Sequence, residues 1–501
     1  MKKTNTSSAA SSLDRAALAA ALKRFPKRLL NILLQSAGEL ELELYLVGGV
    51  LRDALTGTDT HDLDLAIAGG AQRFLRRVRQ RLGYGALVPL GDAEDDTCRL
   101  VIDELLIDVA GYRGGAASIE ADLVRRDFTI NAMGLRFAEI LDVGTPELID
   151  PLAGFADLQK GLIRACTGAF SDDPLRLLRA YRFAAQLDFR IDETTRDEIS
   201  SGAASISRCA AERISYELDL IMTTSRASAT FAAMRASGLL GYLVPELYDG
   251  AGVEQPPFHH LDVMDHNLQT LEWLERIIAA PDSHFPGCGE AAEAFGAEPK
   301  QHIELKWAAL LHDVGKPATR QVNSEKQGRI TFYRHDECGA AIAQRIGERL
   351  RWSRSRKRRI SALISMHMHP FHLGNVLGKE GSLSSRAMLK LCRRAGDLLV
   401  PLFFLAMADS LAGQGPDKPE HIEALLQQLF VDLIRFCEER MQPVLRGPKL
   451  LTGNDLIDTL GLEPGPVIGR LLEAVETAAV AGEIGSKQEA LDWLQKHMEN
   501  S

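Results

Sequence analysis

Two aspartates with the spacing of a metal site, Asp62 and Asp64, lie in the short apolar segment DLDLAI at residues 62–67. Residues two apart in a β-strand point to the same side, so a strand here would present both carboxylates together and turn the leucines toward the core. Two carboxylates so placed can hold a pair of divalent cations, which suits an in-line phosphoryl displacement. A solvated Asp-x-Asp turn is the alternative.

A glycine pair, Gly48-Gly49, precedes these aspartates, between an apolar strand at 44–47 and a short helical run at 50–55 that carries Arg52. Glycines at the start of a helix let backbone N–H groups approach a triphosphate closely. The glycine pair or the aspartate pair alone would favour a solvated loop. Together they predict a nucleotidyl-transfer site in which Gly48, Gly49 and Arg52 contact phosphates.

A third carboxylate, Asp108, lies in the second strand of a predicted hairpin formed by 97–102 and 105–110. A charged residue in an apolar strand needs a partner. We expect that partner to be a metal shared with Asp62 and Asp64. An edge strand that turns Asp108 to water is the alternative.

Polar residues also interrupt the apolar segment at 118–135, where Arg125, Arg126 and Asp127 are followed by Asn131. Guanidinium groups bind phosphate oxygens as a fork, so this cluster suits contacts with the phosphates and ribose of a nucleotide. By itself, the cluster is also compatible with a helix start that contains an ion pair.

The composition, with 501 residues, 46% apolar and 25% charged, is typical of a globular protein of several domains. The seven cysteines include no CxxC pair, so the sequence indicates neither a zinc knuckle nor a disulfide framework, and reduced thiols fit a cytoplasmic protein. The net charge of −10 argues against indiscriminate binding to nucleic acid, and we expect no DNA partner. The chain opens without the apolar core of a signal peptide, and no apolar run approaches the ~20 residues of a membrane span, so we expect no membrane association.

Four segments, in order and spacing, resemble the class II tRNA nucleotidyltransferase and bacterial poly(A) polymerase family. They are LVGGVLRD with HDLDLA, RRDFTINAM, LIDPLAGFADL and DDPLRLLRAYRFAAQLDF. The resemblance implies an α+β fold: a polymerase-β-like head with a mixed sheet, followed by helical neck and body domains. It also implies two Mg²⁺ ions held by Asp62 and Asp64, with CTP and ATP as nucleotides and tRNA as the partner.

The same resemblance assigns residues to the nucleotide. The sugar and phosphates would be contacted by Arg125, Asp127 and Asn131. The base would be selected by Asp173 and Arg176, whose acceptor and donor groups can imitate a Watson–Crick edge. Arg179, one turn further along the same helix face, would support them or a phosphate.

Two departures from the family pattern bear on the activity. Asp172 stands at the first position of the usual EDxxR motif, which weakens any role for that residue. Only residues 114–117 separate the strand LLIDVAGYR from SIEADL, where complete CCA-adding members carry a longer loop, and the short loop resembles the CC-adding subtype. The GRRF pattern of the poly(A) polymerase branch is not visible after Asp64, which favours tRNA. The sequence leaves CC, A and full CCA addition open.

A second set of metal-ligand residues comprises His266, His312, Asp313, His335, His367 and Asp409. Imidazole and carboxylate groups that converge on a divalent metal lower the pKa of its bound water and make that water a nucleophile. A single histidine in a helix is usually just packed, but the whole set, with the segment LLHDVGKP, resembles the HD phosphohydrolase superfamily. This resemblance implies a divalent transition metal such as Ni²⁺, Mn²⁺ or Fe²⁺.

HD domains occur fused to tRNA nucleotidyltransferases, where they are associated with metal-dependent phosphatase or 2′,3′-cyclic phosphodiesterase activity, and the resemblance implies such an activity. His335 and His367 would add a second metal or polarise the phosphate. Lys316 could meet a substrate phosphate. His259 and His260 are expected to be loop residues.

Two further segments allow two interpretations each. The basic segment RWSRSRKRR at 351–359 either follows an RNA backbone or forms a solvated helix entry. The segment at 451–472 resembles the C-terminal helical module of the family. The glycines of 465–469 suit an RNA phosphate or simply begin a capped helix.

The predicted organisation is a flexible tail at 1–24, a nucleotidyltransferase head at 25–145, a helical neck and body at 146–250, an HD domain at 251–415 and a C-terminal helical module at 416–501. Three other functions stay open. They are a poly(A) polymerase, a mainly hydrolytic phosphatase or phosphodiesterase whose head captures RNA, and an RNA-binding scaffold with silent metal sites. The sequence does not predict an oligomeric state.

Overall fold

The computed structural model describes residues 18, 22–57, 62–90, 96–141, 146–287, 289–297, 299–323 and 329–499. Its contacts divide the chain into two compact units, Met1–Ala210 with Ser237–Leu239, and Ala211–Ala236 with Leu240–Ser501. This division falls inside the segment 146–250 that the sequence assigns to one neck and body domain. Of the predicted tail at 1–24, only Leu18 and the short helix η1 (Leu22–Arg24) are described, and Leu18 and Leu22 are buried; the rest lies outside the described residues.

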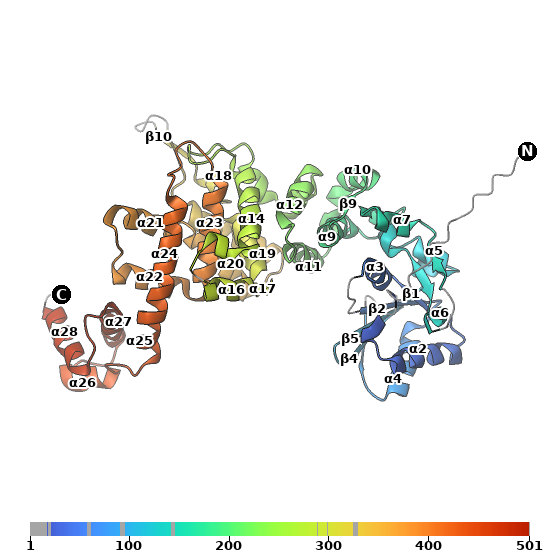
Figure 1. Cartoon of the computed structure of the whole chain (residues 1–501), viewed down its shortest axis with the longest axis horizontal. Helices are drawn as coiled ribbons and strands as arrows, with labels where there is room; N and C mark the ends of the chain where they lie inside the picture. Colours follow the sequence, from blue (N-terminus) through green and yellow to red (C-terminus); the bar gives the residue numbers. More distant parts are fainter. Residues whose placement is uncertain are drawn as a thin grey trace, which may run out of the picture. The chain divides into compact units, whose positions relative to one another are not determined.

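A seven-stranded mixed sheet forms the head of the first unit (Figure 1). In sheet order the strands are β3 (Ala86–Pro89), β4 (Thr97–Ile102), β5 (Leu105–Gly111), β2 (Asp62–Ile67), β1 (Tyr45–Val47), β6 (Gly134–Arg136) and β7 (Leu148–Ile149). Strands β2 and β5 run parallel, whereas the other neighbouring strands of this described sheet pair antiparallel. The mixed sheet and the β4–β5 hairpin predicted from the sequence are confirmed.

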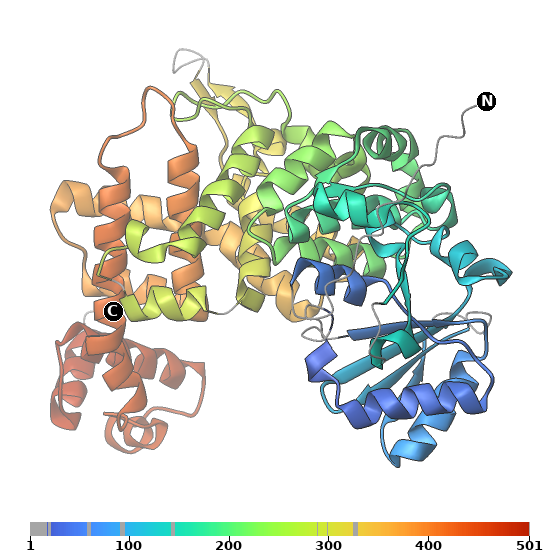
Figure 2. The same cartoon turned by 45° about the vertical axis from the view of Figure 1, so that its right-hand side comes forward.

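The alternation of residues along β2 separates the core from the candidate site. Leu63 and Leu65 are buried, whereas Asp62 and Asp64 are half-buried on the other side of the strand. The helices α2 (Lys27–Glu39) and α4 (Ala71–Leu82) lie side by side under one face of the sheet, opposite α3 (Gly49–Thr56) (Figures 1 and 2). Apolar side chains of α4, among them Phe74, are buried where this helix packs on the sheet.

Short helices and two small strands complete the first unit. They are η2 (Arg113–Gly115), α5 (Ile119–Leu123), η3 (Thr129–Asn131), α6 (Phe137–Leu141), α7 (Gly154–Gln159), β8 (Leu162–Ile163), α8 (Ala169–Asp172), α9 (Arg176–Leu187), β9 (Arg190–Ile191), α10 (Glu193–Gly202) and η4 (Ala203–Arg208).

The second unit is mostly helical, as the sequence predicts. Its elements are α11 (Ala211–Met222), α12 (Ala227–Ala236), α13 (Leu239–Leu243), η5 (Pro245–Gly250), α14 (Val263–Ala279), α15 (Pro281–His284), α16 (Gly289–Gly296), α17 (Pro299–Leu311), α18 (Lys316–Thr319), β10 (Gln321–Asn323), β11 (Arg329–Thr331), α19 (His335–Arg349), α20 (Arg354–Met366), α21 (His369–Glu380), α22 (Ser385–Ala395), η7 (Gly396–Leu398), α23 (Leu399–Ala412), α24 (Ile422–Phe436), η8 (Cys437–Met441), α25 (Gln442–Arg446), α26 (Gly453–Leu460), α27 (Pro466–Ala481) and α28 (Lys487–Glu499). Helices α14 and α23 pack on each other, and Trp307, Phe403 and Phe404 are fully buried.

One stretch of this unit, Ser385–Ala412, is long and apolar enough to cross a membrane by length and composition. The sequence predicts no apolar run of this length, so the stretch is an exception to that expectation. Packing accounts for it, because 78% of its most apolar window is buried inside the protein. A core helix has this property.

Ion pairs occupy much of the basic segment at 351–359. Arg356 donates to both oxygens of Asp219 at 2.5 and 2.6 Å, and Arg359 pairs with Glu304 at 2.5 Å. These pairings tie the start of α20 to neighbouring helices and leave fewer cations for an RNA backbone. They favour the interpretation of this segment as a helix entry.

Candidate functional site

A cavity of about 630 Å³ opens in the first unit beside β2. It is lined by Val47, Gly48, Gly49, Val50, Arg52, Asp53, Asp62, Asp64, Leu65, Thr97, Asp108, Ala110, Arg113, Arg126, Asp127, Asn131, Asp173, Arg176, Arg179, Arg182 and Phe183. The structure therefore brings together every head residue that the sequence assigns to catalysis or to the nucleotide, except Arg125. The guanidinium of Arg125 lies against Gly114 instead.

The three aspartates occupy adjacent strands in register. Asp64 of β2 is the neighbour of Asp108 of β5, and Asp108 faces Arg99 of β4 on its other side. Arg99 donates to both oxygens of Asp108 at 2.6 and 2.7 Å. Asp108 therefore lies within the sheet, not at its edge, and an arginine that the sequence analysis did not consider already neutralises it.

Burial raises the pKa of Asp64 to about 6, and the neighbouring Asp108 adds to the rise, while Arg126 and the Gly49 N–H partly offset it. A raised pKa means that the positive groups near Asp64 do not fully compensate its negative charge. A divalent cation between Asp64 and Asp62 would supply that charge, so the donor set fits a metal. Asp62 and Asp64 are the residues that would hold it.

Glycine is required at position 48 for two reasons. Its φ of +74° lies in the left-handed region, and a Cβ there would lie 3.1 Å from Oδ2 of Asp64 and 3.3 Å from Nη1 of Arg126. The N–H of Gly49 donates to Oδ2 of Asp64 at 3.3 Å. The predicted phosphate donor thus helps to position a carboxylate.

A polar network joins α3, η3 and α9 along the cavity wall. Arg52 donates to Oδ1 of Asn131 at 2.8 Å, and Asn131 donates through Nδ2 to Asp127 at 3.0 Å. Arg179 closes the network by pairing with Asp127 at 2.6 Å. Burial alone would raise the pKa of Asp127, but Arg179 and Asn131 outweigh burial and hold that pKa well below its usual range.

Of the two residues predicted to select the base, Asp173 directly follows α8 and Arg176 is the first residue of α9. Asp173 accepts from the N–H of Leu175 at 3.1 Å, and Arg176 donates through Nη1 to backbone carbonyls, including that of Ala169 at 3.3 Å. Both residues also line the cavity. Their roles in base selection stay predictions.

Two cavity residues, Arg113 and Phe183, were not predicted from the sequence, and Arg126 was predicted only as one member of a cluster suited to phosphates. Arg126 stood beside Arg125 in the same motif, so the motif marked the pair without showing which member faces the cavity. Phe183 lies beneath the guanidinium of Arg52 at 5.1 Å and that of Arg179 at 5.4 Å. Nothing in the sequence pattern singled out Arg113.

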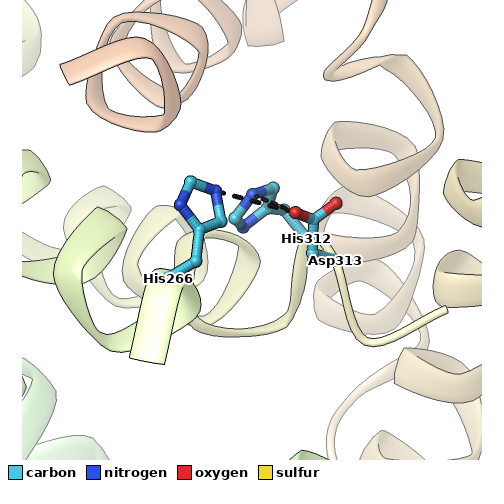
Figure 3. A group of neighbouring side chains, drawn as sticks. All are labelled: His266, His312 and Asp313. Carbon is cyan, nitrogen blue, oxygen red and sulfur yellow. Dashed lines mark ion pairs between the residues drawn. The ribbon is translucent and has the colours of Figure 1, made fainter. Parts of the chain in front are cut away.

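The second set of ligand-type residues converges inside the helical unit. His266 from α14 and His312 after α17 both turn toward Asp313 (Figure 3), with Nε2 to Oδ2 distances of 3.6 and 3.2 Å. Asp409 from α23 completes this group, since its Oδ1 lies 3.0 Å from Nε2 of His266 and 3.6 Å from that of His312. All four side chains are buried.

The other oxygen of Asp313 faces a second group. Oδ1 lies 3.4 Å from Nε2 of His335 and 3.8 Å from Nε2 of His367, and these two nitrogens are 3.2 Å apart. The groups His266–His312–Asp313 and Asp313–His335–His367 could each hold a metal ion. Asp313 belongs to both groups, which is the arrangement expected of a two-metal site.

Backbone contacts prepare the imidazoles to act as ligands. Nδ1 of His312, His335 and His367 lies 2.9, 2.8 and 2.7 Å from a carbonyl oxygen three residues earlier. A ring that donates its Nδ1 proton to a carbonyl presents Nε2 as a lone pair toward the centre. Nε2 of His312 and Oδ1 of Asp313 are buried without a hydrogen-bond partner among the described atoms. Such orphaned acceptors fit a divalent cation.

Without a metal, a proton takes its place. Burial alone would lower the pKa of His312, but Asp313 and Asp409 raise it to about 10. By contrast, burial lowers the pKa of His367 to about 3, because the neighbouring His335 and His312 add to the effect. The group around His312 therefore carries the surplus negative charge, and a cation would replace its proton.

A cavity of about 650 Å³ adjoins this cluster, and Lys316, Arg334 and His372 lie among its lining residues. Nζ of Lys316 contacts Oδ2 of Asp313 at 2.5 Å and Oε1 of Gln255 at 2.7 Å, so Lys316 is tied to the shared ligand. His259, expected to be a loop residue, also lines the cavity, and its ring packs edge-on against His266 with centroids 4.5 Å apart.

Four family models match the chain in order. They are the "Poly A polymerase head domain" at 44–164, the "Probable RNA and SrmB- binding site of polymerase A" at 188–249, the "HD domain" at 263–412 and the "tRNA nucleotidyltransferase domain 2" at 443–494. The head and HD domains imply the use of divalent metals, in agreement with both clusters.

Characterised relatives match along most of the chain. The A-adding tRNA nucleotidyltransferase of Deinococcus radiodurans is 32% identical over 91% of this chain and 96% of its own length. The CC-adding tRNA nucleotidyltransferase of Thermus thermophilus is 31% identical over 90% of this chain and 93% of its own length. Among solved structures, the Thermotoga maritima CCA-adding enzyme complexed with tRNA shares the fold with a TM-score of 0.62 at 22% identity, covering 96% of this chain and 98% of that one. The chain therefore belongs to the tRNA nucleotidyltransferase family and is an enzyme with a fused HD domain.

Proposed function

We propose that the head transfers nucleotidyl groups from CTP, ATP or both to the 3′ hydroxyl of tRNA and releases pyrophosphate. The observation that carries this proposal is the row of Asp62, Asp64 and Asp108 beside Gly48, in one cavity with Asp173 and Arg176. Related enzymes are named for such additions to tRNA, which favours tRNA over a poly(A) tail.

In this proposal each group of residues has a task. Asp62 and Asp64 would hold two Mg²⁺ ions, and these would supply positive charge for the attacking 3′ oxygen and the triphosphate. Asp108 supports Asp64 from the adjacent strand, while Arg99 limits the repulsion between the two carboxylates. Arg52, Asp127 and Asn131 form the wall against which the sugar and phosphates lie.

The short loop favours addition of C residues. Only residues 112–118, which include η2, connect β5 to α5, so no long loop lies between these two elements. Complete CCA-adding members carry a longer loop here, which is thought to help the switch from C to A. The relatives include both A-adding and CC-adding enzymes, so product length is the property to measure.

The decisive experiment supplies purified protein with tRNA that lacks its last three nucleotides, and with each labelled nucleotide alone and together. Extension by two C residues supports CC addition, and extension only by ATP, and only of a tRNA already ending in CC, refutes the loop argument. Asp62→Ala and Asp64→Ala should abolish extension in folded protein. Normal extension by the double variant would refute the metal assignment.

For the helical unit we propose a metal-dependent phosphohydrolase that uses a transition metal such as Ni²⁺, Mn²⁺ or Fe²⁺. Asp313 with His266, His312 and Asp409 would hold one ion, and Asp313 with His335 and His367 a second. Such an activity would free a 3′ hydroxyl from a phosphate or cyclic phosphate before the head extends it. Opening of 2′,3′-cyclic nucleotides to the 2′- or 3′-monophosphate, and release of inorganic phosphate from 3′-phosphorylated RNA, each assayed with each metal in turn, test this. The cytoplasm stays the predicted location.

A further inference from the structure

Two arginines of the head cavity share a single carboxylate. Asp122 is fully buried, accepts from the backbone N–H of Arg113 at 2.8 Å and from its Nη1 at 3.2 Å, and lies outside the cavity lining. The same carboxylate accepts from Nε and Nη2 of Arg126 at 3.3 and 3.1 Å. One negative charge thus serves two guanidinium groups, and both groups line the cavity.

The other arginines of the cavity wall are differently placed. Arg52 has Asp53 at 2.7 Å, and Arg179 has Asp127 at 2.6 Å. Arg176 directs Nη1 into backbone carbonyls. Arg113 and Arg126 differ from Arg52 and Arg179 in that they share one carboxylate, that of Asp122.

Arg126 lies close to Asp64, one of the two carboxylates proposed to bind metal. Nη1 of Arg126, which has no hydrogen-bond partner among the described residues, approaches Gly48 from one side while Oδ2 of Asp64 approaches it closely as well. Arg126 is only 7% exposed, so its charge is partly stripped of water and needs an anion. Burial lowers the pKa of Arg126 to about 10, and the nearby Arg113 contributes to that shift.

Asp64 cannot serve as that anion once it binds a cation. The phosphate chain of a nucleotide is the anion that must lie beside Asp62 and Asp64 for the proposed transfer, and guanidinium groups bind phosphate oxygens with a matching fork. From this geometry we propose that Arg113 and Arg126 bind the phosphate chain of the incoming nucleotide as a pair, and that Asp122 is the positioning residue that aligns them. This inference rests on the proposed nucleotidyl transfer and adds Arg113 and Asp122 to its site.

The test compares binding of CTP and CMP by the full chain without tRNA, so that no transfer occurs. Arg113→Gln should weaken CTP about tenfold or more, since a hydrogen bond to a charged group is worth about 1.5–3 kcal/mol. CMP should change much less, so the ratio of the CTP to the CMP affinity falls. Arg113→Lys, which keeps the charge without the fork, should retain part of the ratio. Arg136→Gln removes a head arginine that pairs with Glu43 outside the cavity lining and should leave the ratio unchanged.

Asp122 is tested by a double-mutant cycle on the same ratio. If Asp122 acts through Arg113, then Asp122→Asn lowers the ratio less in the Arg113→Gln background than in the wild type. A purely structural Asp122 would lower the melting temperature and leave the ratio intact, which overturns the positioning role. An unchanged ratio in folded Arg113→Gln overturns the phosphate contact.

Measuring tRNA extension on the same variants distinguishes a failure of the phosphate contact from a failure of the proposed tRNA activity. Extension by the wild type together with an unaltered CTP to CMP ratio in Arg113→Gln refutes this inference alone. Absence of extension together with a ratio that falls refutes the tRNA activity and keeps the phosphate pair. If ATP is the nucleotide used, ATP and AMP replace CTP and CMP.

Discussion

Replacing Asp64 with asparagine is expected to make the metal-free protein more stable while it removes nucleotidyl transfer. Asp64 is half-buried beside Asp108 and Asp62, and this burial with these like charges raises its pKa from 3.8 to about 6. Asparagine keeps the shape and the oxygen that accepts from the Gly49 N–H, and it carries no charge to bury. Ionised Asp64, which the proposed nucleotidyl transfer requires, therefore lowers the stability of the metal-free protein.

The magnitude follows from linkage between protonation and folding. A pKa that is higher in the folded than in the unfolded state favours folding below the unfolded value, and this contribution is lost as pH rises through the folded value. The shift from 3.8 to about 6 corresponds to about 3 kcal/mol of destabilisation by ionised Asp64 above pH 6. Asp64→Asn should recover much of it at pH 8 and less at pH 5, where wild-type Asp64 is already protonated in the folded state.

The assay is thermal unfolding of wild type and Asp64→Asn in EDTA at pH 8 and pH 5. About 3 kcal/mol corresponds to a rise of the melting temperature of about 5–10 °C for a unit of roughly 200 residues. Asp197→Asn, an exposed change in the same unit, controls for loss of a charge. Added Mg²⁺ should raise the melting temperature of the wild type more than that of the variant. A variant no more stable than wild type at pH 8, or equally stabilised at both pH values, would refute the reasoning.

Two further predictions concern the second unit. Asp313→Asn should lose bound metal, measured by elemental analysis, and phosphohydrolase activity, because both of its oxygens face histidine ligands; full metal retention would contradict the shared-ligand role. Lys306→Met should destabilise the protein by about 3–5 kcal/mol. Glu275 is a buried carboxylate that accepts from the first N–H groups of α12, and the substitution removes the Lys306 ammonium, which lies 2.9 Å from it. The double variant Lys306→Met/Glu275→Gln should be more stable than Lys306→Met in thermal unfolding, and equal or lower stability would count against this account.

The local pattern was enough to predict four strands of the head, β1, β2, β4 and β5, and the side on which the aspartates of β2 lie, but it did not predict β3, β6 or β7. Alternation with period two predicted that Asp62 and Asp64 share a face, and the burial of Leu63 and Leu65 bears this out. Register between strands is not encoded locally, so the neighbour relation of Asp64 and Asp108 could only be expected in general terms. The pairing of Asp108 with Arg99 could not be predicted for the same reason.

A second limit of prediction from the sequence is that it does not distinguish adjacent residues of the same type. The motif marked Arg125 and Arg126 alike, but α5 ends at Leu123 and the path of the chain after it decides which guanidinium reaches the cavity. A third limit concerns the basic segment 351–359, because the acids that neutralise it come from helices that are far away in the sequence. Asp219, for example, is 137 residues from its partner Arg356.

The two candidate metal clusters differ in whether a bound cation would displace a proton, and this difference provides a way to tell them apart. At pH 8 ionised Asp64, whose pKa is about 6, has no proton to lose. His312, whose pKa Asp313 and Asp409 raise to about 10, still carries one at that pH. Filling the His312 group at pH 8 should therefore release a proton, whereas filling the Asp62–Asp64 pair should release none. Proton release measured during metal titration thus reports on the helical unit, and Asp313→Asn should abolish it while Asp62→Ala leaves it in place.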